Sequence, residues 1–207
     1  MLMAKLMQQL CRFSNEPFEV VYLAMNPGFS SDNLKLLEQN AQIFGLPLKI
    51  FETNIFEVIS KTDRSPHYLC AKMRRGFLYS EAQKRGCNKI ALGHHMDDVI
   101  ETALMSVFYG GRFQAMPPVL DSQNFPGMRL IRPMYAVSEA DILAFKNYHG
   151  LKFLSCACKL ENCGITKRQE AKALIAELNN KNPSVSKNIF NALHNVRQAT
   201  LPSYDTE

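Results

Sequence analysis

A helix that ends at a glycine and is followed by a short apolar segment recurs along this chain, and this repeat constrains the fold most. In the first unit, Ser31 and Asp32 can cap the helix, and a glycine just past a helix end is a common left-handed stop. The repeats and their expected strands are Gly45 before residues 47–51, Gly86 before residues 88–92, and Gly150 before residues 151–154. Strands that alternate with helices predict an α/β fold with a mostly parallel sheet covered on both faces.

Other segments extend this prediction. The nearly continuous apolar run Phe18 to Met25 is typical of a strand buried on both faces, and Asn26-Pro27-Gly28 forms a turn after it. A short strand is expected at residues 130–131, after a loop over residues 112–128. Helices are expected at the following places: residues 1–13, 70–85, 96–109 up to Gly110-Gly111, 138–149 with Ser138 and Asp141 as a capping box, and two after Gly164.

Composition limits the functional classes. A length of 207 residues suits one α/β region, residues 1–133, and a helical region, residues 134–207. The net charge of +5 permits contact with nucleic acid or a nucleotide but does not require it. The apolar opening, residues 1–10, is too short and interrupted to span a membrane, so we expect a cytoplasmic protein without membrane contact.

The segment Gly93-His94-His95-Met96-Asp97-Asp98 is the first candidate site. It lies where an expected strand ends and a helix begins, and ligands of parallel sheets bind outside the carboxyl ends of the strands. A helix N-terminus also favours anionic groups. The segment therefore predicts a site for a nucleotide, for magnesium or for a group that loses a proton. The alternative is that Asp97 caps the helix and its neighbours are solvated.

Cysteines form the second and third candidate sites. Cys70 precedes Lys72, Arg74 and Arg75, a basic setting that stabilises a thiolate, although a solvated basic helix face is an equal alternative. Three further cysteines lie within eight residues, which indicates metal or sulfur chemistry in a reducing compartment. These are Cys156, Cys158 and Cys163. Zinc with four ligands, completed by Cys70 or His67, and an iron–sulfur cluster are both compatible with this pattern.

Five segments together resemble the PP-loop (N-type ATP pyrophosphatase) enzymes that modify tRNA. The segment Leu92 to Thr102 resembles the second signature of this superfamily. The remaining segments resemble its tRNA 2-thiocytidine synthetase (tRNA cytidine 2-sulfurtransferase) group: residues 70–76, 108–111, 116–118 and 131–133. The resemblance covers nearly the whole chain and implies a Rossmann-like fold of the adenine-nucleotide alpha hydrolase type.

The resemblance implies ATP, Mg²⁺ and a four-iron four-sulfur ([4Fe–4S]) cluster held by three cysteines. It implies that ATP adenylates the C2 oxygen of a cytidine in the tRNA anticodon loop, and that sulfur then displaces AMP to give 2-thiocytidine. The partners it implies are tRNA and a sulfur donor such as a cysteine desulfurase, and it also allows a homodimer.

The resemblance further implies the roles of individual residues. The catalytic set is Asp97, Asp98, His95 and Arg74. The residues expected beside the nucleotide are Leu23, Ala24, Met25, Asn26, Gly93, His94 and Arg75. The metal-ligand candidates are Cys70, Cys156, Cys158, Cys163 and His67.

The chain departs from the group in two respects. His67 stands where the family has the first cysteine of a CxxC pair that ends at Cys70. The family's SGGxDS phosphate loop is absent from the sequence, and Met1 to Phe13 resembles the helix that follows this loop. A non-catalytic remnant or tRNA-binding module is therefore a second hypothesis, and a lysidine synthase-like ligase is a third.

Overall fold

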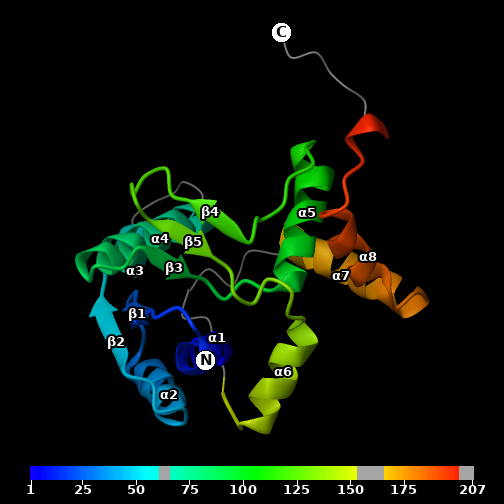
Figure 1. Cartoon of the computed structure of the whole chain (residues 1–207). Helices are drawn as coiled ribbons and strands as arrows, with labels where there is room; N and C mark the ends of the chain where they lie inside the picture. The colour runs from blue at the N-terminus through cyan, green and yellow to red at the C-terminus, as the bar shows by residue number, and fades with distance from the viewer. Residues whose placement is uncertain (61–65, 153–165, 201–207) are drawn as a thin grey trace.

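The computed structural model describes residues 1–60, 66–152 and 166–200 of the chain (Figure 1). The elements follow in this order: α1 (Leu2–Phe13), β1 (Tyr22–Asn26), α2 (Ser31–Gln42), β2 (Leu48–Glu52), α3 (Ile55–Ser60), α4 (Pro66–Lys84), β3 (Lys89–Ala91), α5 (Met96–Gly110), β4 (Val119–Asp121), β5 (Arg129–Ile131), α6 (Glu139–Tyr148), α7 (Lys167–Lys181), α8 (Val185–Ala192) and the 3₁₀ turn η1 (Gln198–Thr200). The α/β class predicted from the sequence is confirmed.

The helix–glycine–strand repeat is confirmed at the level of backbone geometry. The three glycines have left-handed φ angles of 59°, 73° and 62°, at Gly45, Gly86 and Gly150. After each of them the next amide donates a hydrogen bond to a carbonyl five residues earlier, which is the expected left-handed cap. These bonds are Leu46 to Ala41 at 3.1 Å, Cys87 to Ala82 at 3.0 Å and Leu151 to Lys146 at 3.0 Å.

The strands that follow the glycines agree with the prediction in two of the three units. β2 and β3 lie within one residue of their predicted bounds. After Gly150, residues 151–152 form no strand, and residues 153–154 lie outside the described residues. In the first unit the helix cap is Ser30 rather than Ser31 or Asp32, because the Ser30 hydroxyl accepts the Asn33 amide at 3.4 Å.

The strands form two sheets within the described residues. β1 pairs with β2 in parallel, and the second sheet has the order β3-β5-β4. β3 and β5 are parallel, whereas β4 and β5 are antiparallel. β4 lies inside the segment predicted as a loop. Its three residues are all exposed, so the strand carries no buried apolar pattern that the sequence could reveal.

The first strand is shorter and less buried than predicted. β1 begins at Tyr22 rather than at Phe18, and only Met25 and Asn26 of its five residues are buried. Its residues alternate between two helical layers. Tyr22 packs against a cluster formed by α2 and its flanks, together with Met1 and with Ala4 of α1. Leu23 packs against a cluster that includes residues of α4.

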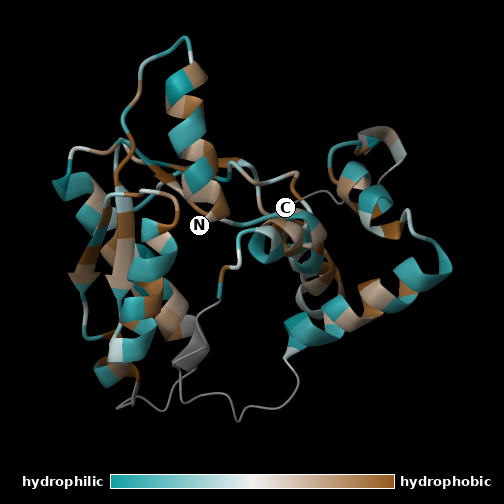
Figure 2. Cartoon of the chain, turned by 90° about the horizontal axis from the view of Figure 1, so that it is seen from below, coloured by the Kyte–Doolittle hydropathy of each residue, from teal (hydrophilic) through white to brown (hydrophobic). Residues whose placement is uncertain are grey.

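Helices cover the strands and also pack on one another. α4 contacts both β1 and β3, and α7 and α8 pack against α5. The helices carry both hydrophilic and hydrophobic bands (Figure 2). Val99 and Ile100 of α5 have no exposed surface, which makes this helix the anchor of its region. None of the described helices is both long and apolar enough to cross a bilayer.

Candidate functional site

The carboxyl end of β1 forms a rigid turn. The side chain of Asn26 is buried, and its Oδ1 accepts the amides of Gly28 at 3.0 Å and Phe29 at 2.7 Å. Its Nδ2 donates to Glu52 Oε2 at 2.7 Å, which ties the turn to β2. Gly28 has a φ of 112°, and a Cβ at this position would lie 3.2 Å from Phe56. The positive φ favours glycine at this turn, and a Cβ would also crowd the Phe56 side chain.

The carboxyl end of β3 leads into α5 through Gly93, His94 and His95. His95 is the N-cap of α5 in an extended conformation, and its amide donates to Asp98 Oδ2 at 3.1 Å. The imidazole of His95 lies 3.6 Å from Asp97 and 3.4 Å from Asp98. The candidate site is thus placed at a strand-to-helix junction, as the sequence predicts.

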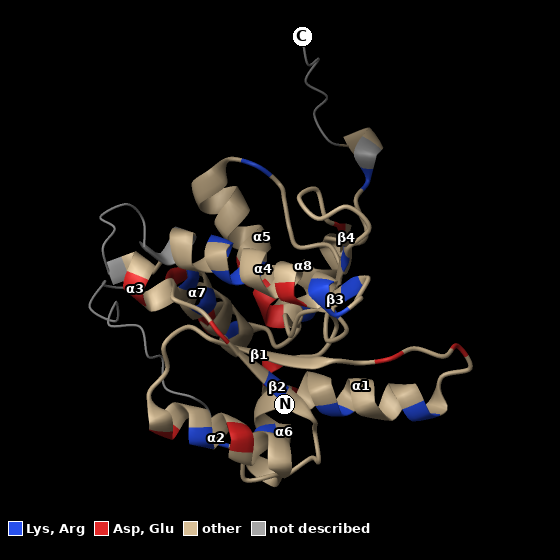
Figure 3. Cartoon of the chain, turned by 90° about the vertical axis from the view of Figure 1, so that its left-hand side faces the viewer, with Lys and Arg blue, Asp and Glu red and all other residues tan. Residues whose placement is uncertain are grey.

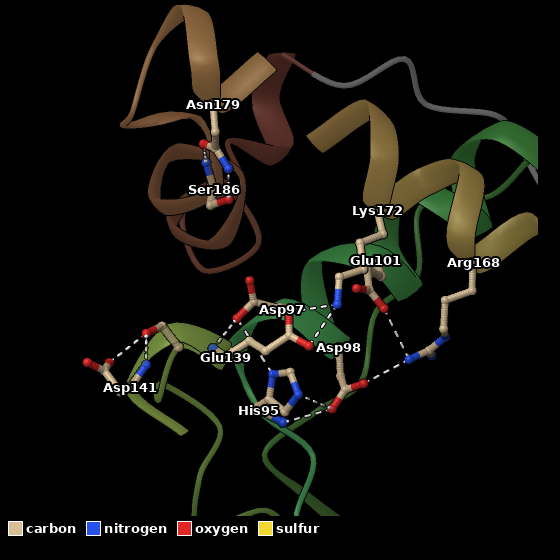
Figure 4. A network of polar contacts seen from close by, with 11 residues as sticks. His95, Asp97, Asp98, Glu101, Glu139, Asp141, Arg168, Lys172, Asn179 and Ser186 are labelled. Carbon is tan, nitrogen blue, oxygen red and sulfur yellow. Dashed lines mark hydrogen bonds and ion pairs between the residues drawn. The ribbon is translucent and has the colours of Figure 1, made fainter. Parts of the chain in front are cut away.

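The carboxylates of α5 are anchored by two other helices (Figure 4). Asp97 Oδ2 accepts the amide of Glu139 at the start of α6, at 2.7 Å. Asp98 Oδ1 accepts Arg168 Nη1 of α7 at 2.8 Å, and the same nitrogen lies 3.2 Å from Glu101 Oε2. Both Asp98 oxygens are therefore engaged, whereas Asp97 Oδ1 lies outside the described hydrogen bonds and the Asp97 side chain is 27% exposed.

Burial shifts the pKa of two groups at this junction, His94 and Arg132. Burial lowers the pKa of His94 below its ordinary value of 6.5, and the positive charge of Arg132 lowers it further. Burial also lowers the pKa of Arg132. His94 is therefore a neutral imidazole at neutral pH. His94 Nδ1 and Arg132 Nε are buried without a hydrogen-bond partner among the described residues. Orphaned polar atoms of this kind suit a polar or anionic ligand.

Glu101 is buried, which raises the pKa of its carboxyl, and Arg168 opposes this shift. Its side chain is 7% exposed, so it depends on Arg168 for charge compensation. The structure thus pairs Arg168 with two carboxylates of α5, those of Asp98 and Glu101.

Replacing Arg168 with Met should lower the free energy of unfolding by about 2 kcal/mol at neutral pH. Removing one partner of a buried pair costs ~3–5 kcal/mol, and the cost is smaller here because the Arg168 side chain is 43% exposed. A raised folded pKa favours the native state at low pH, and this benefit is lost as pH rises above the Glu101 reference value of 4.5. The destabilisation measured by urea unfolding should therefore be larger near pH 8 than near pH 5.

Two further variants make this measurement specific. Lys181→Met removes an ion pair on the same helix, whose partner Glu177 is 63% exposed, and should change stability by less than about 0.5 kcal/mol. Glu101→Gln combined with Arg168→Met should recover most of the loss. The proposed compensation of Glu101 by Arg168 would be contradicted if Arg168→Met lowered the free energy of unfolding equally at both pH values and with or without Glu101→Gln.

The structure places the other predicted site residues in different surroundings. Leu23, Ala24 and Met25 lie on β1, which leads into the Asn26 turn. Arg74 and Arg75 are exposed on α4 and take no part in the described polar network of α5. Their predicted contact with phosphate stays a prediction.

The predicted metal ligands lie mostly outside the described residues. Cys156, Cys158 and Cys163 fall in the segment 153–165, and only the backbone of His67 is described. Cys70 is 9% exposed and packs in a cluster with Met25, Ile55 and Ile59. Within residues 1–60, 66–152 and 166–200, no three His, Cys, Asp or Glu residues converge on a metal site.

Arg132 and Glu139 are the site residues that the sequence analysis assigned no role. Arg132 follows β5, donates from Nη1 to the Pro117 carbonyl, and lies beside His94. Glu139 joins Asp97 to Lys172, whose Nζ lies 2.7 Å from its carboxylate. Arg132 belongs to a quoted family segment, which was an available signal. No sequence signal pointed to Glu139, because its contacts come from distant segments of the chain.

Comparison with known proteins identifies the family of the chain. The model of the PP-loop domain family matches residues 5–160. The chain is 35% identical to the tRNA-cytidine(32) 2-sulfurtransferase of Syntrophotalea carbinolica over 187 residues, which are 89% of this chain and 72% of that protein. The chain belongs to the PP-loop family, in its tRNA-cytidine 2-sulfurtransferase branch.

A second relative supports this assignment, and a solved structure supports the fold. The tRNA-cytidine(32) 2-sulfurtransferase of Geobacter sulfurreducens is 34% identical over 204 residues, which are 95% of this chain and 77% of that protein. The U34-tRNA thiolase NcsA of Methanococcus maripaludis, solved with its [4Fe–4S] cluster, superposes with a TM-score of 0.67. Its identity is 18%, over 94% of this chain and 68% of that one, so this likeness confirms the PP-loop fold.

Proposed function

We propose that this PP-loop protein is an ATP-dependent sulfurtransferase that converts a cytidine of tRNA, at position 32, to 2-thiocytidine. The identity to relatives of that name over most of both chains carries the proposal. The orphaned polar atoms of His94 and Arg132, beside the ends of two parallel strands, support a nucleotide site there.

The proposed reaction has two steps. The C2 oxygen of the cytidine attacks the α-phosphorus of ATP, and pyrophosphate leaves. A sulfur nucleophile then attacks C2, and the C–O bond breaks so that AMP leaves with the former C2 oxygen. Adenylation is needed because it converts a poor leaving oxygen into a good one, and a magnesium ion neutralises charge on the phosphates.

We propose different roles for the two aspartates, because their hydrogen bonds differ. We assign Asp97 to Mg²⁺ or ATP, because one of its oxygens lies outside the described hydrogen bonds. Asp98 is instead a positioning residue, because His95 and Arg168 engage its two oxygens. Neutral His94 can donate or accept a hydrogen bond, and Arg132 supplies positive charge beside it.

An iron–sulfur cluster would supply a binding position for the sulfur that is transferred. Cys70 is the candidate ligand with a described side chain, and it sits near the end of β1 in a cluster with Met25. We propose that it ligates a [4Fe–4S] cluster together with cysteines of the segment 153–165. A thiol that is packed among apolar side chains suits an iron ligand that is shielded from water.

The direct test is to incubate the purified protein with ATP, Mg²⁺, an unmodified tRNA, a cysteine desulfurase and cysteine. Digested tRNA is then analysed for 2-thiocytidine by mass spectrometry. Product and AMP should form in equal amounts, and a tRNA with uridine at position 32 should give neither. Binding of tRNA without product would favour the binding-module hypothesis, and ATP-dependent addition of lysine would favour the lysidine synthase hypothesis.

A further inference from the structure

The last turn of α5 carries an exposed group of aromatic rings and cations. Phe108 is 50% exposed, Tyr109 is also exposed, and Phe113, just after the helix, is 64% exposed. Arg112 lies between these rings in the chain, and Lys167 at the start of α7 lies over the ring of Tyr109. We call these five residues the α5 end patch. Figure 1 shows that this end of α5 extends beyond the strands, and the proposed reaction gives the patch no role.

Contacts with α7 hold the ring of Tyr109 in place. Its hydroxyl donates a hydrogen bond to the Glu170 carboxylate, and the Lys167 Nζ lies 4.8 Å from the centre of its ring. Phe108 meets Tyr109 edge to face, with the ring centres 6.4 Å apart. A ring that is already fixed loses little conformational freedom when a flat ligand stacks beside it. The patch is therefore preorganised for stacking.

Phe108 lies on the face of α5 that carries Asp97. The eleven residue steps from 97 to 108 make about three full turns, so the two side chains leave the helix in nearly the same direction. They lie about 16 Å apart along the axis, because each residue rises about 1.5 Å. By the same count Tyr109 lies above Asp98, and the contacts agree, because both of these residues bind α7.

This distance suits a nucleic acid strand that enters the site at the first turn of α5. Stacked nucleotides are spaced by about 3.4 Å along a strand. A strand that begins beside Asp97 therefore reaches the α5 end patch in about five stacked nucleotides, and in fewer when the strand is extended.

The charges of the patch also favour a nucleic acid. Neither Arg112 nor Lys167 forms an ion pair within the part of the chain that the structure describes. Glu170 is the acid beside them, and it already accepts the Tyr109 hydroxyl. Lys and Arg residues occur both on α7 and in the segment that follows α5 (Figure 3). Single-stranded RNA is bound by this combination, because its bases stack on aromatic rings while its phosphates meet cations.

We propose that the α5 end patch binds unpaired bases of the tRNA anticodon loop that follow the target cytidine. This inference rests on the proposed function, which puts the adenylation site at the first turn of α5. The bases stack on the exposed rings of Phe108 and Phe113, and Arg112 and Lys167 contact the phosphates between them. Holding the loop at two points about 16 Å apart orients the target base toward the reacting groups.

The affinity of the purified protein for a fluorescent anticodon stem-loop RNA, measured by anisotropy, tests the proposal. Phe108→Leu combined with Phe113→Leu keeps apolar side chains but removes both rings, and should weaken binding about tenfold or more. Phe13→Leu makes the same change on α1 at a ring that is 80% exposed, and should leave the affinity unchanged. The unfolding midpoint of each variant should stay close to that of the unchanged protein, because all three rings are exposed.

Abasic RNAs show whether a base is what the rings bind. Each unpaired nucleotide after the target is made abasic in turn. At the stacked position, removal of the base should weaken binding by the unchanged protein about tenfold. The double variant should lose less than about twofold at that position, because its rings are already gone.

Three results would overturn the proposal: equal affinity of the double variant and the unchanged protein, equal abasic effects in both, or loss of a protein dimer in the double variant during sedimentation. The last result would make a second copy the occupant. These readouts need neither ATP nor sulfur. If RNA binding shows the expected losses but no 2-thiocytidine forms, the proposed function fails and the patch remains an RNA-binding surface. If the double variant thiolates tRNA with an unchanged KM, the patch assignment alone fails.

Discussion

Replacing Asp97 with Asn is expected to slow 2-thiocytidine formation by about 100-fold or more, because it removes the charge assigned to Mg²⁺ or ATP. In the unchanged protein the Glu139 amide donates to Asp97 Oδ2 at 2.7 Å. The side-chain oxygen of Asn can still accept this hydrogen bond, so the contact between α5 and α6 should persist. The rate is measured under single-turnover conditions, and Mg²⁺–ATP affinity is measured in parallel.

Two comparisons separate catalysis from folding in this variant. Asp121→Asn removes a carboxylate that is 79% exposed and paired with Arg129 on β5, and should leave the rate unchanged. The unfolding midpoint of Asp97→Asn should stay close to that of the unchanged protein. Retention of more than about a tenth of the rate would remove Asp97 from the reaction.

Replacing Ile100 with Ala is expected to lower the free energy of unfolding by about 2–5 kcal/mol. Ile100 has no exposed surface, and it lies on the helix against which α7 and α8 pack. The truncation leaves a cavity that the surrounding helices can fill only in part. Urea unfolding followed by circular dichroism gives the value.

Val107→Ala is the matched control, because Val107 lies on the same helix and is 43% exposed. Its loss should be below about 1 kcal/mol, since exposed methyl groups bury little additional area on folding. The Ile100→Ala protein should also bind tRNA less well when warmed, because α5 carries Asp97 and Asp98 at its first turn. Similar losses at the two positions would show that α5 is not the anchor of this region.

The sequence alone was sufficient for the class of the fold and for placing the segment Gly93–Asp98 at a strand-to-helix junction. The helix ends depend on local chemistry: glycine permits the left-handed φ observed at Gly45, Gly86 and Gly150, and the amide after each glycine closes the helix end. The junction at His95, with Asp98 three residues later, is likewise a local cap. The family assignment made from the motif residues is also confirmed. Each motif is a continuous run of residues, so it can be recognised without knowledge of the fold.

Tertiary structure decided which charged groups work together. Arg168 is 70 residues from Asp98, and no periodicity in the sequence relates them. Burial of Glu101 and His94 also arises only when helices pack on the junction, and it raises the pKa of Glu101 and lowers that of His94. The sequence predicted equal roles for Asp97 and Asp98, whereas in the folded structure their hydrogen-bond partners differ. A side chain's identity is local, but its solvent exposure and its partners are properties of the whole fold.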